Sequence, residues 1–211
     1  MKKQITIIGA SAGVGLLCVN QALTRGHKVV TLSRSTDSLP THPNLISIKG
    51  NATNKEDIIK AIQNSDAVIV ALGTGKSMKA TTLYTDSAHA LIEAQKETKT
   101  TIPFIILVGF GAGNSSQYQN IFIRMAMKIL MGALYKNKTQ MEELIAASSI
   151  KWEFVRPGIL TNHEFTGKYR VVTYYSKDMK INKISRADVA DYLINQAENP
   201  TDLGKYPALS Y

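Results

Sequence analysis

The sequence predicts an α/β protein in which a doubly wound parallel sheet lies between two layers of helices. Two observations support this three-layer fold: short apolar runs bounded by turn residues recur along the chain, and segments with helical spacing separate them. Such runs are typical of strands covered on both faces, and strand–helix alternation is typical of parallel sheets. The length of 211 residues suits a single domain, 1–211, with a full core.

Six of the apolar runs are expected to be strands, at residues 5–8, 28–32, 45–49, 67–71, 104–108 and 152–155. Four segments with helical spacing lie between them, at 15–24, 55–63, 81–97 and 139–148. Local signals agree with these bounds, because Gly26 can end the first helix and Asn54 can cap the second. The first turn of that second helix also carries Glu56 and Asp57, which suit a helix N-terminus.

The chain beyond residue 157 has shorter elements, and we expect 157–211 to contribute the substrate-side lobe of the single domain. A helix is predicted at 187–196, and Arg186 and Asp188 at its start are expected to fix a turn and cap the helix. The apolar stretch at 121–134 is predicted to be a core or interface helix. Within it, the methionine-rich run at 124–131 is expected to pack in the core rather than to form a pocket lid or a partner surface.

A glycine-rich turn follows the first predicted strand and opens the first helix. In this context Gly9 allows the tight turn, Gly13 lets the backbone approach a pyrophosphate, and Gly15 lets the helix pack close to the strand. The amides at the helix N-terminus then face the anion. The turn predicts a dinucleotide site with contacts from Gly9, Ser11, Ala12, Gly13, Val14 and Gly15.

The end of the second predicted strand favours NADP(H) over NAD(H). NAD-binding proteins usually offer an acid there to the ribose hydroxyls, whereas this chain has Ser33 and Arg34. A guanidinium can pair with a 2′-phosphate, and a serine hydroxyl can donate a hydrogen bond to it. Asp37, three residues further on, is assigned to the loop.

Several further motifs make the chain resemble the atypical short-chain dehydrogenase/reductase group, particularly its NmrA-like and biliverdin/flavin reductase-like proteins, over nearly its whole length. Residues 50–52 and 71–75 are similar to two cofactor loops of the group, and 154–160 and 184–190 are similar to its C-terminal signatures. The glycine spacing, Gly-x-x-x-Gly-x-Gly, is that of the classical branch instead. The resemblance implies a Rossmann fold and further cofactor contacts at Asn51, Ala52, Leu72, Gly73, Thr74, Gly75, Pro157 and Gly158.

The catalytic residues of this group are only partly present. Short-chain reductases use Ser, Tyr and Lys, with the Tyr and Lys four residues apart, and Lys138 matches the lysine, which also binds the cofactor. Leu134 then occupies the tyrosine position. Tyr135 is a candidate acid, although one residue turns a helical side chain by about 100°. Gly109 and Phe110 occupy the serine positions.

The missing serine and tyrosine disfavour the reduction of simple ketones, because a positioned acid accelerates that reaction roughly 10²- to 10⁴-fold. A flavin, quinone or bilin-like acceptor delocalises the incoming charge, so the sequence predicts an NAD(P)H-dependent oxidoreductase that reduces such a small molecule. His163 is a further candidate catalytic residue, and Phe110 and Phe165 are candidate stacking faces. The alternative is a non-catalytic NADP(H)-sensing regulator of NmrA type. An epimerase is disfavoured, because it also needs the tyrosine and a larger lobe.

The composition limits the partners. The net charge of +9 is spread along the chain without a basic block, so no nucleic-acid partner is expected. No membrane partner is expected, because Arg124 and Lys128 interrupt a stretch already too short to span a bilayer. The single cysteine, Cys18, favours a reducing, cytoplasmic location, and the spacing of His and Cys residues predicts no metal site. We expect a monomer or a homodimer.

Overall fold

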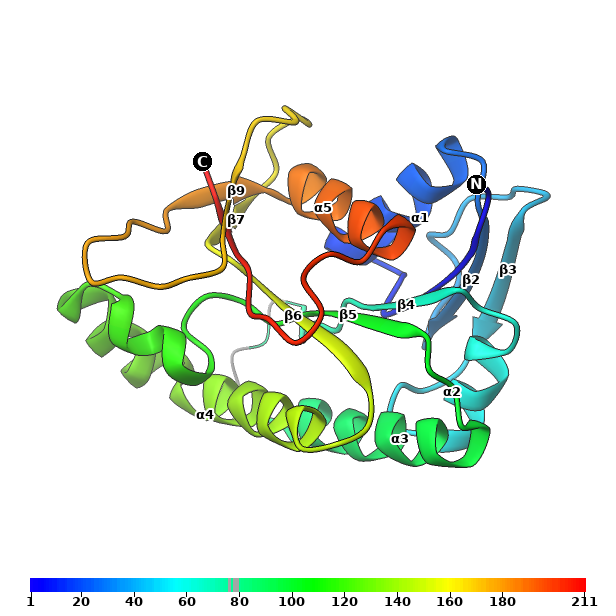
Figure 1. The fold of residues 1–211 in the computed structure, drawn as a ribbon, viewed down its shortest axis with the longest axis horizontal. Coiled ribbons are helices and arrows are strands. Elements are labelled where there is room, and N and C mark those ends of the chain that lie inside the picture. The colour runs from blue at the N-terminus through cyan, green and yellow to red at the C-terminus, as the bar shows by residue number, and fades with distance from the viewer. Residues whose placement is uncertain (76, 78–79) are drawn as a thin grey trace.

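A computed structural model describes residues 1–75, 77 and 80–211. Its main sheet has the strand order β3-β2-β1-β4-β5-β6-β10-β8, and the first six strands are parallel (Figure 1). Because this is the strand order of a Rossmann fold, the predicted fold class is confirmed. The six strands are β1 (Gln4–Ile8), β2 (Lys28–Ser33), β3 (Leu45–Lys49), β4 (Ala67–Val70), β5 (Pro103–Leu107) and β6 (Lys151–Pro157).

The C-terminal part of the chain extends this sheet. Strand β10 (Ala208–Ser210) pairs in parallel with β6, and β8 (Arg170–Val172) pairs antiparallel with β10. A separate parallel pair forms from β7 (Ile159–Thr161) and β9 (Lys183–Ser185). Residues 157–211 therefore supply both an edge of the main sheet and a small lobe above its carboxyl ends.

Helices cover both faces of the sheet. Helices α1 (Gly13–Thr24) and α5 (Arg186–Glu198) pack on one face, against side chains such as Ile5 and Ile7. The other face, which includes Ile8, is covered by α2 (Lys55–Ile62), α3 (Leu83–Thr98) and α4 (Ile121–Ala146). Neighbouring strand residues point to opposite faces, which gives two apolar cores. A short 3₁₀ helix, η1 (Gly113–Tyr118), precedes α4.

Helix α4 differs most from the sequence prediction. The predicted helix at 139–148 is the C-terminal end of a 26-residue helix that begins at Ile121. The prediction that the methionine-rich run packs in the core is wrong for Met125, Ile129 and Leu130, because these side chains are exposed. The physical reason is that the N-terminal half of α4 extends past the strands, so no sheet lies beneath it (Figure 1).

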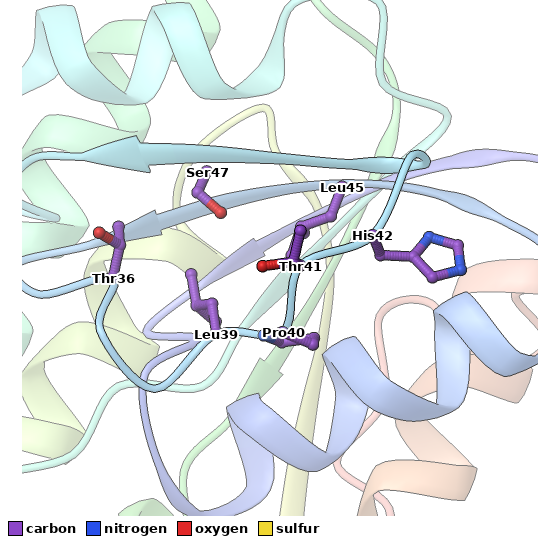
Figure 2. A pocket seen from close by; sticks show the side chains of 7 residues that line it. All are labelled: Thr36, Leu39, Pro40, Thr41, His42, Leu45 and Ser47. Carbon is purple, nitrogen blue, oxygen red and sulfur yellow. The ribbon is translucent and has the colours of Figure 1, made fainter.

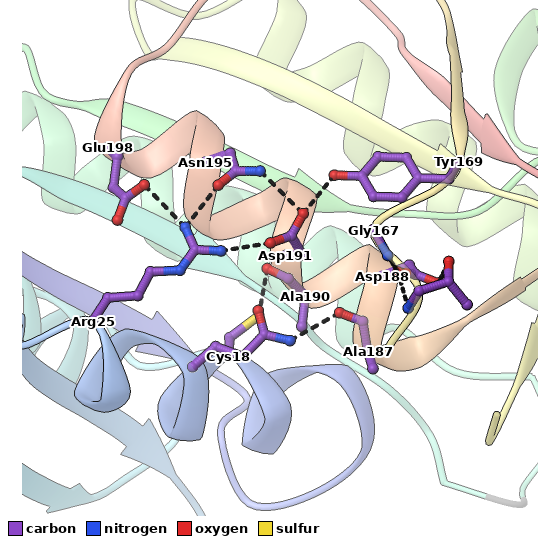
Figure 3. A network of polar contacts seen from close by, with 12 residues as sticks. Cys18, Arg25, Gly167, Tyr169, Ala187, Asp188, Ala190, Asp191, Asn195 and Glu198 are labelled. Atoms are coloured by element: carbon purple, nitrogen blue, oxygen red, sulfur yellow. Dashed lines mark hydrogen bonds and ion pairs between the residues drawn. The ribbon is translucent and has the colours of Figure 1, made fainter. Parts of the chain in front are cut away.

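Polar contacts fix α5 against α1 (Figure 3). Arg25 binds Asp191 at 2.6 Å and Glu198 at 2.9 Å across the two helices. At the start of α5, the Asp188 carboxylate accepts hydrogen bonds from the backbone amides of Thr166 and Gly167. The backbone amide of Asp188 donates to the side chain of the N-cap residue Ser185 at 3.0 Å. Asp188 therefore fixes the turn at residues 166 and 167, as expected, but the prediction that Arg186 and Asp188 cap the helix is wrong, because the N-cap residue is Ser185.

Candidate cofactor and acceptor cleft

A cleft of about 740 Å³ runs along the carboxyl ends of the parallel strands. This edge of a doubly wound sheet is where such folds bind ligands. The cleft brings together nearly all of the predicted cofactor and catalytic residues. Those that line it are Gly9, Ser11, Ala12, Gly13, Val14, Ser33, Arg34, Asn51, Ala52, Leu72, Gly73, Thr74, Gly75, Tyr135, Lys138, Pro157 and Gly158.

The glycine turn has the geometry of a phosphate cradle. A Cβ atom on Gly9 would lie 2.6 Å from the Ala71 carbonyl oxygen, and one on Gly15 would overlap the carbonyl of Gly9. Gly15 does not line the cleft, so its effect is to allow this close packing. At the start of α1 the N-cap residue, Ala12, forms no side-chain cap bond, and the first turn has no acid. The amides of that turn are therefore suited to a pyrophosphate, as NAD(P)H requires.

The end of β2 carries the residues expected to select the 2′-phosphate. Arg34 is exposed at the rim of the cleft. The Ser33 hydroxyl accepts a hydrogen bond from the Ala10 amide at 2.9 Å, which ties β2 to the glycine turn. Asp37 accepts a hydrogen bond from the Ser35 hydroxyl at 3.0 Å, within its own loop. The cleft thus has a cation at the expected 2′-phosphate position.

Tyr135 and Lys138 converge on Gly109. A Cβ atom at Gly109 would lie 3.5 Å from the Tyr135 hydroxyl and 3.8 Å from the Lys138 amino group. Lys138 donates a hydrogen bond to the Val108 carbonyl at 2.5 Å, and its Nζ atom lies 5.2 Å from the centre of the Tyr84 ring. The Tyr135 hydroxyl and the Lys138 amino group therefore meet beside Gly109, and the Tyr84 ring lies next to Lys138.

Burial tunes these three groups. It raises the pKa of Tyr135, and it raises the pKa of Tyr84 to about 12 with a further contribution from Tyr135. Burial lowers the pKa of Lys138 to about 8, although the charge of Glu142 opposes this change. At neutral pH both phenols keep their protons, and most of the lysine is charged. The site can therefore donate a proton from Tyr135 and hold an anionic or hydroxyl-bearing ligand with Lys138.

The structure does not bring every candidate to the cleft. His163 is exposed in the loop after β7 and is not among the lining residues, because the chain has passed the sheet edge there. Phe165 is exposed outside the cleft as well. The Ser115 hydroxyl is buried, accepts a hydrogen bond from the Gly111 amide and donates one to the Ala112 carbonyl, so its hydrogen bonds lie within its own turn.

The sequence analysis did not predict that Tyr84 lines the cleft, nor which side chains line the part of the cleft beyond Phe110. Tyr84 lies in the first turn of α3, where its amide donates to Asn137 of α4 at 2.9 Å. No local motif marks it, since only the packing of α3 on α4 places it beside Lys138. Beyond Phe110 the cleft is lined by the apolar or aromatic side chains of Tyr118, Met127, Met131, Ile159, Leu160, Met179 and Ile181, and by the polar side chains of Gln119, Asn120, Lys180, Asn182 and Arg186.

A buried ion pair supports the floor of the cleft. Arg156 binds Glu142 through two hydrogen bonds, Nε to Oε1 at 2.9 Å and Nη2 to Oε2 at 2.7 Å. It also donates to Asn114 at 2.7 Å, and its guanidinium lies 4.3 Å from the centre of the Tyr206 ring. This cluster joins β6, α4 and η1, which carry or adjoin the residues around Gly109.

A second, shallower hollow of about 330 Å³ lies beside the loop between β2 and β3 (Figure 2). Thr36, Leu39, Thr41 and Ser47 line it together with His42, which accepts a hydrogen bond from the Asn44 amide. Its lining includes no residue of the glycine turn. The larger cleft is therefore the candidate functional site.

Among residues 1–75, 77 and 80–211, no group of three His, Cys, Asp or Glu side chains is arranged to hold a metal ion. In the same residues, no helix has both the length and the apolarity needed to cross a bilayer.

Comparison with known proteins identifies the family. Residues 9–200 match a family model described as NAD(P)H-binding, and the chain therefore belongs to this NAD(P)H-binding family. Together with the fold, this confirms the resemblance to the atypical short-chain dehydrogenase/reductase group.

Solved structures share the fold at low sequence identity. A short-chain dehydrogenase/reductase from Veillonella parvula DSM 2008, in complex with NADP, has a TM-score of 0.83 and 16% identity, with coverage of 100% of this chain and 95% of that one. ChuY, an anaerobillin reductase from Escherichia coli O157:H7, has a TM-score of 0.77 and 19% identity, with coverage of 98% and 96%.

A curated relative matches over a shorter region. It is a 3-beta-hydroxysteroid dehydrogenase from Mycolicibacterium neoaurum, 35% identical over 65 residues. These residues are 31% of this chain and 18% of the relative, so the chain matches less than a fifth of that protein's length.

Proposed function

We propose that this protein is an NADPH-dependent reductase of a conjugated small molecule of the flavin, quinone or bilin type. One observation carries the proposal: the cleft joins a phosphate cradle to an apolar, methionine-lined half, and Tyr135 and Lys138 lie at the junction. Methionine side chains adapt to irregular flat ligands. The similarity in fold to an anaerobillin reductase agrees with this class of acceptor.

The residues of the chain have separate tasks in this reaction. NADPH, when bound, supplies a hydride. The turn from Gly9 to Gly13 would hold the pyrophosphate, and Arg34 would pair with the 2′-phosphate. Lys138 would hydrogen-bond the nicotinamide ribose. Tyr135, kept neutral by burial, would donate its proton to the reduced acceptor and regain one from solvent.

The preference for NADPH rests on the charge at the cleft rim. Arg34 can form charge-assisted hydrogen bonds with a 2′-phosphate, each worth about 1.5–3 kcal/mol. We therefore expect NADPH to bind at least about tenfold more tightly than NADH. In Arg34→Ala this preference should disappear while NADH affinity stays the same. Lys28→Ala, at the opposite end of β2, is the matched control and should keep the preference.

The test combines binding with turnover. The purified protein is titrated with NADPH and NADH, and a flavin, a short-chain quinone and biliverdin are then added while nicotinamide absorbance is followed. Acceptor-dependent oxidation of NADPH supports the reductase. Tight binding without oxidation by any acceptor refutes it and favours the NADP(H)-sensing regulator. Equal affinity for the two nucleotides refutes the NADPH preference.

A further inference from the structure

The N-terminal half of α4 presents apolar side chains to solvent. We define its outer face as Phe122, Met125, Ile129 and Leu130, and the exposed fractions of Phe122, Ile129 and Leu130 are 79%, 80% and 63%. Soluble proteins normally turn the apolar stripe of a helix inward. A continuous exposed stripe of large apolar side chains marks an interaction surface.

The spacing places this outer face away from the cleft. Residues 122, 125 and 129 follow the three- and four-residue steps of one helix face, and Leu130 lies at the edge of this face, about 100° round the helix from Ile129. Met127 and Met131 lie on another side of the helix and line the cleft. The same two turns of α4 therefore carry one apolar face for the cleft and a second for solvent.

The charge around the outer face has one sign. Arg124, Lys128 and Lys136 are exposed on α4, and the sequence contains no Asp or Glu from residue 98 to residue 141. Across the mouth of the cleft, the exposed Lys177 and Lys180 add further positive charge, with Asp178 as the acid between them. The apolar face is thus bordered by cations, and the chain as a whole carries a charge of +9.

We propose that the outer face of α4 docks onto an anionic lipid bilayer. Its apolar side chains enter the boundary between headgroups and acyl chains, and Arg124, Lys128 and Lys136 bind the anionic headgroups. A second copy of this chain fits less well, because apposed helices would bring their cations together without an acid on α4 before Glu142. The apolar stretch is too short to span a bilayer, but this does not exclude interfacial binding, which needs only one apolar face of a helix.

Docking of this kind deepens the proposed function and rests on it. Met127 and Met131 follow the outer face around the same helix, so the mouth of the cleft lies next to the docked surface. Met179 and Lys180 line the other side of that mouth. A conjugated acceptor dissolved in the bilayer, such as a quinone with an isoprenoid tail, would pass from the membrane into the apolar half of the cleft.

The docking test is vesicle flotation of the full chain. The wild type should float with phosphatidylglycerol-containing vesicles and remain unbound with pure phosphatidylcholine. I129E/L130E should abolish flotation, and R124Q/K128Q should weaken it about tenfold or more. Ile46→Glu places an acid on an exposed apolar residue of β3 and should float like the wild type. NADPH binding and melting temperature confirm that each variant is folded.

Three results would overturn docking: no flotation of the wild type, unchanged flotation of I129E/L130E, or a wild-type dimer that I129E/L130E converts to a monomer without any vesicle binding. Turnover separates this proposal from the reductase itself. A water-soluble quinone should be reduced equally by wild type and I129E/L130E, whereas a long-chain quinone in vesicles should be reduced only by the wild type. Absence of turnover with both quinones refutes the reductase, while flotation still decides docking.

Discussion

Removing the carboxylate of Glu142 from its buried pair with Arg156 is expected to lower the free energy of unfolding by about 3–5 kcal/mol. The two residues are 3% and 1% exposed, and two hydrogen bonds of 2.9 Å and 2.7 Å join them. In Glu142→Ala the guanidinium stays buried, and it keeps its contacts with Asn114 and with the Tyr175 and Tyr206 rings. An uncompensated buried charge is the main source of the cost.

Urea unfolding followed by the fluorescence of Trp152 measures this change, because that ring packs on Phe154 and Tyr206. For a chain of this size, the melting temperature should fall by roughly 6–20 °C. The double variant E142L/R156M should cost less than Glu142→Ala, since no lone charge remains. Glu97→Ala breaks a solvent-accessible pair with Lys55 and should cost far less than Glu142→Ala. A loss below 1 kcal/mol in Glu142→Ala would refute the reasoning.

Three further predictions concern the cleft and the core. Tyr135→Phe should lower kcat about 100-fold without changing NADPH affinity, whereas Tyr174→Phe at an exposed site should change neither; an unchanged kcat would exclude Tyr135 as the proton donor. NADPH affinity should fall as the pH rises through about 8, where Lys138 loses its proton. Lys138→Met should bind NADPH more weakly than the wild type, with an affinity that does not change across this pH range. Burial raises the pKa of Glu153 to about 7. Between about pH 4.3 and 7 the Glu153 carboxyl is therefore protonated in the folded state but ionised in the unfolded state. The free energy of unfolding should decline as the pH rises through that window. Glu153→Gln should remove this decline in urea midpoints measured from pH 5 to 8, and an unchanged slope would contradict the assignment.

The sheet and the phosphate cradle could be predicted because their signals are local. Strands buried on both faces must be apolar throughout, and all six predicted strands are present within a few residues of their expected bounds. The glycines are equally constrained, since Gly9 and Gly15 lie where a Cβ atom would meet backbone. The continuity of α4 and the exposure of its N-terminal half were not predicted, because apolar spacing at 121–134 does not show whether a sheet lies beneath the helix.

The acceptor half of the cleft could not be predicted because it is assembled from distant segments. Met131 of α4, Ile159 of β7 and Met179 of the loop before β9 share no sequence motif, and each resembles an ordinary core residue. Tyr84 reaches the site only through the packing of α3 on α4. These contacts depend on tertiary structure, whereas the cofactor half depends on turns that the local sequence determines.

Tyr135 and Lys138 of α4 lie together beside Gly109. A spacing of three residues, like a spacing of four, keeps two side chains on one helix face, so Tyr135 and Lys138 remain neighbours. The hydroxyl of Tyr135 lies 3.5 Å from where a Cβ atom of residue 109 would stand, and Gly109 has a φ of +125°, which a serine rarely adopts. A serine at position 109 would therefore strain the backbone, although its Cβ atom would only be in ordinary van der Waals contact with the Tyr135 hydroxyl. Glycine suits this backbone conformation, and the proposed proton donor Tyr135 lies beside it, three residues before Lys138 on α4.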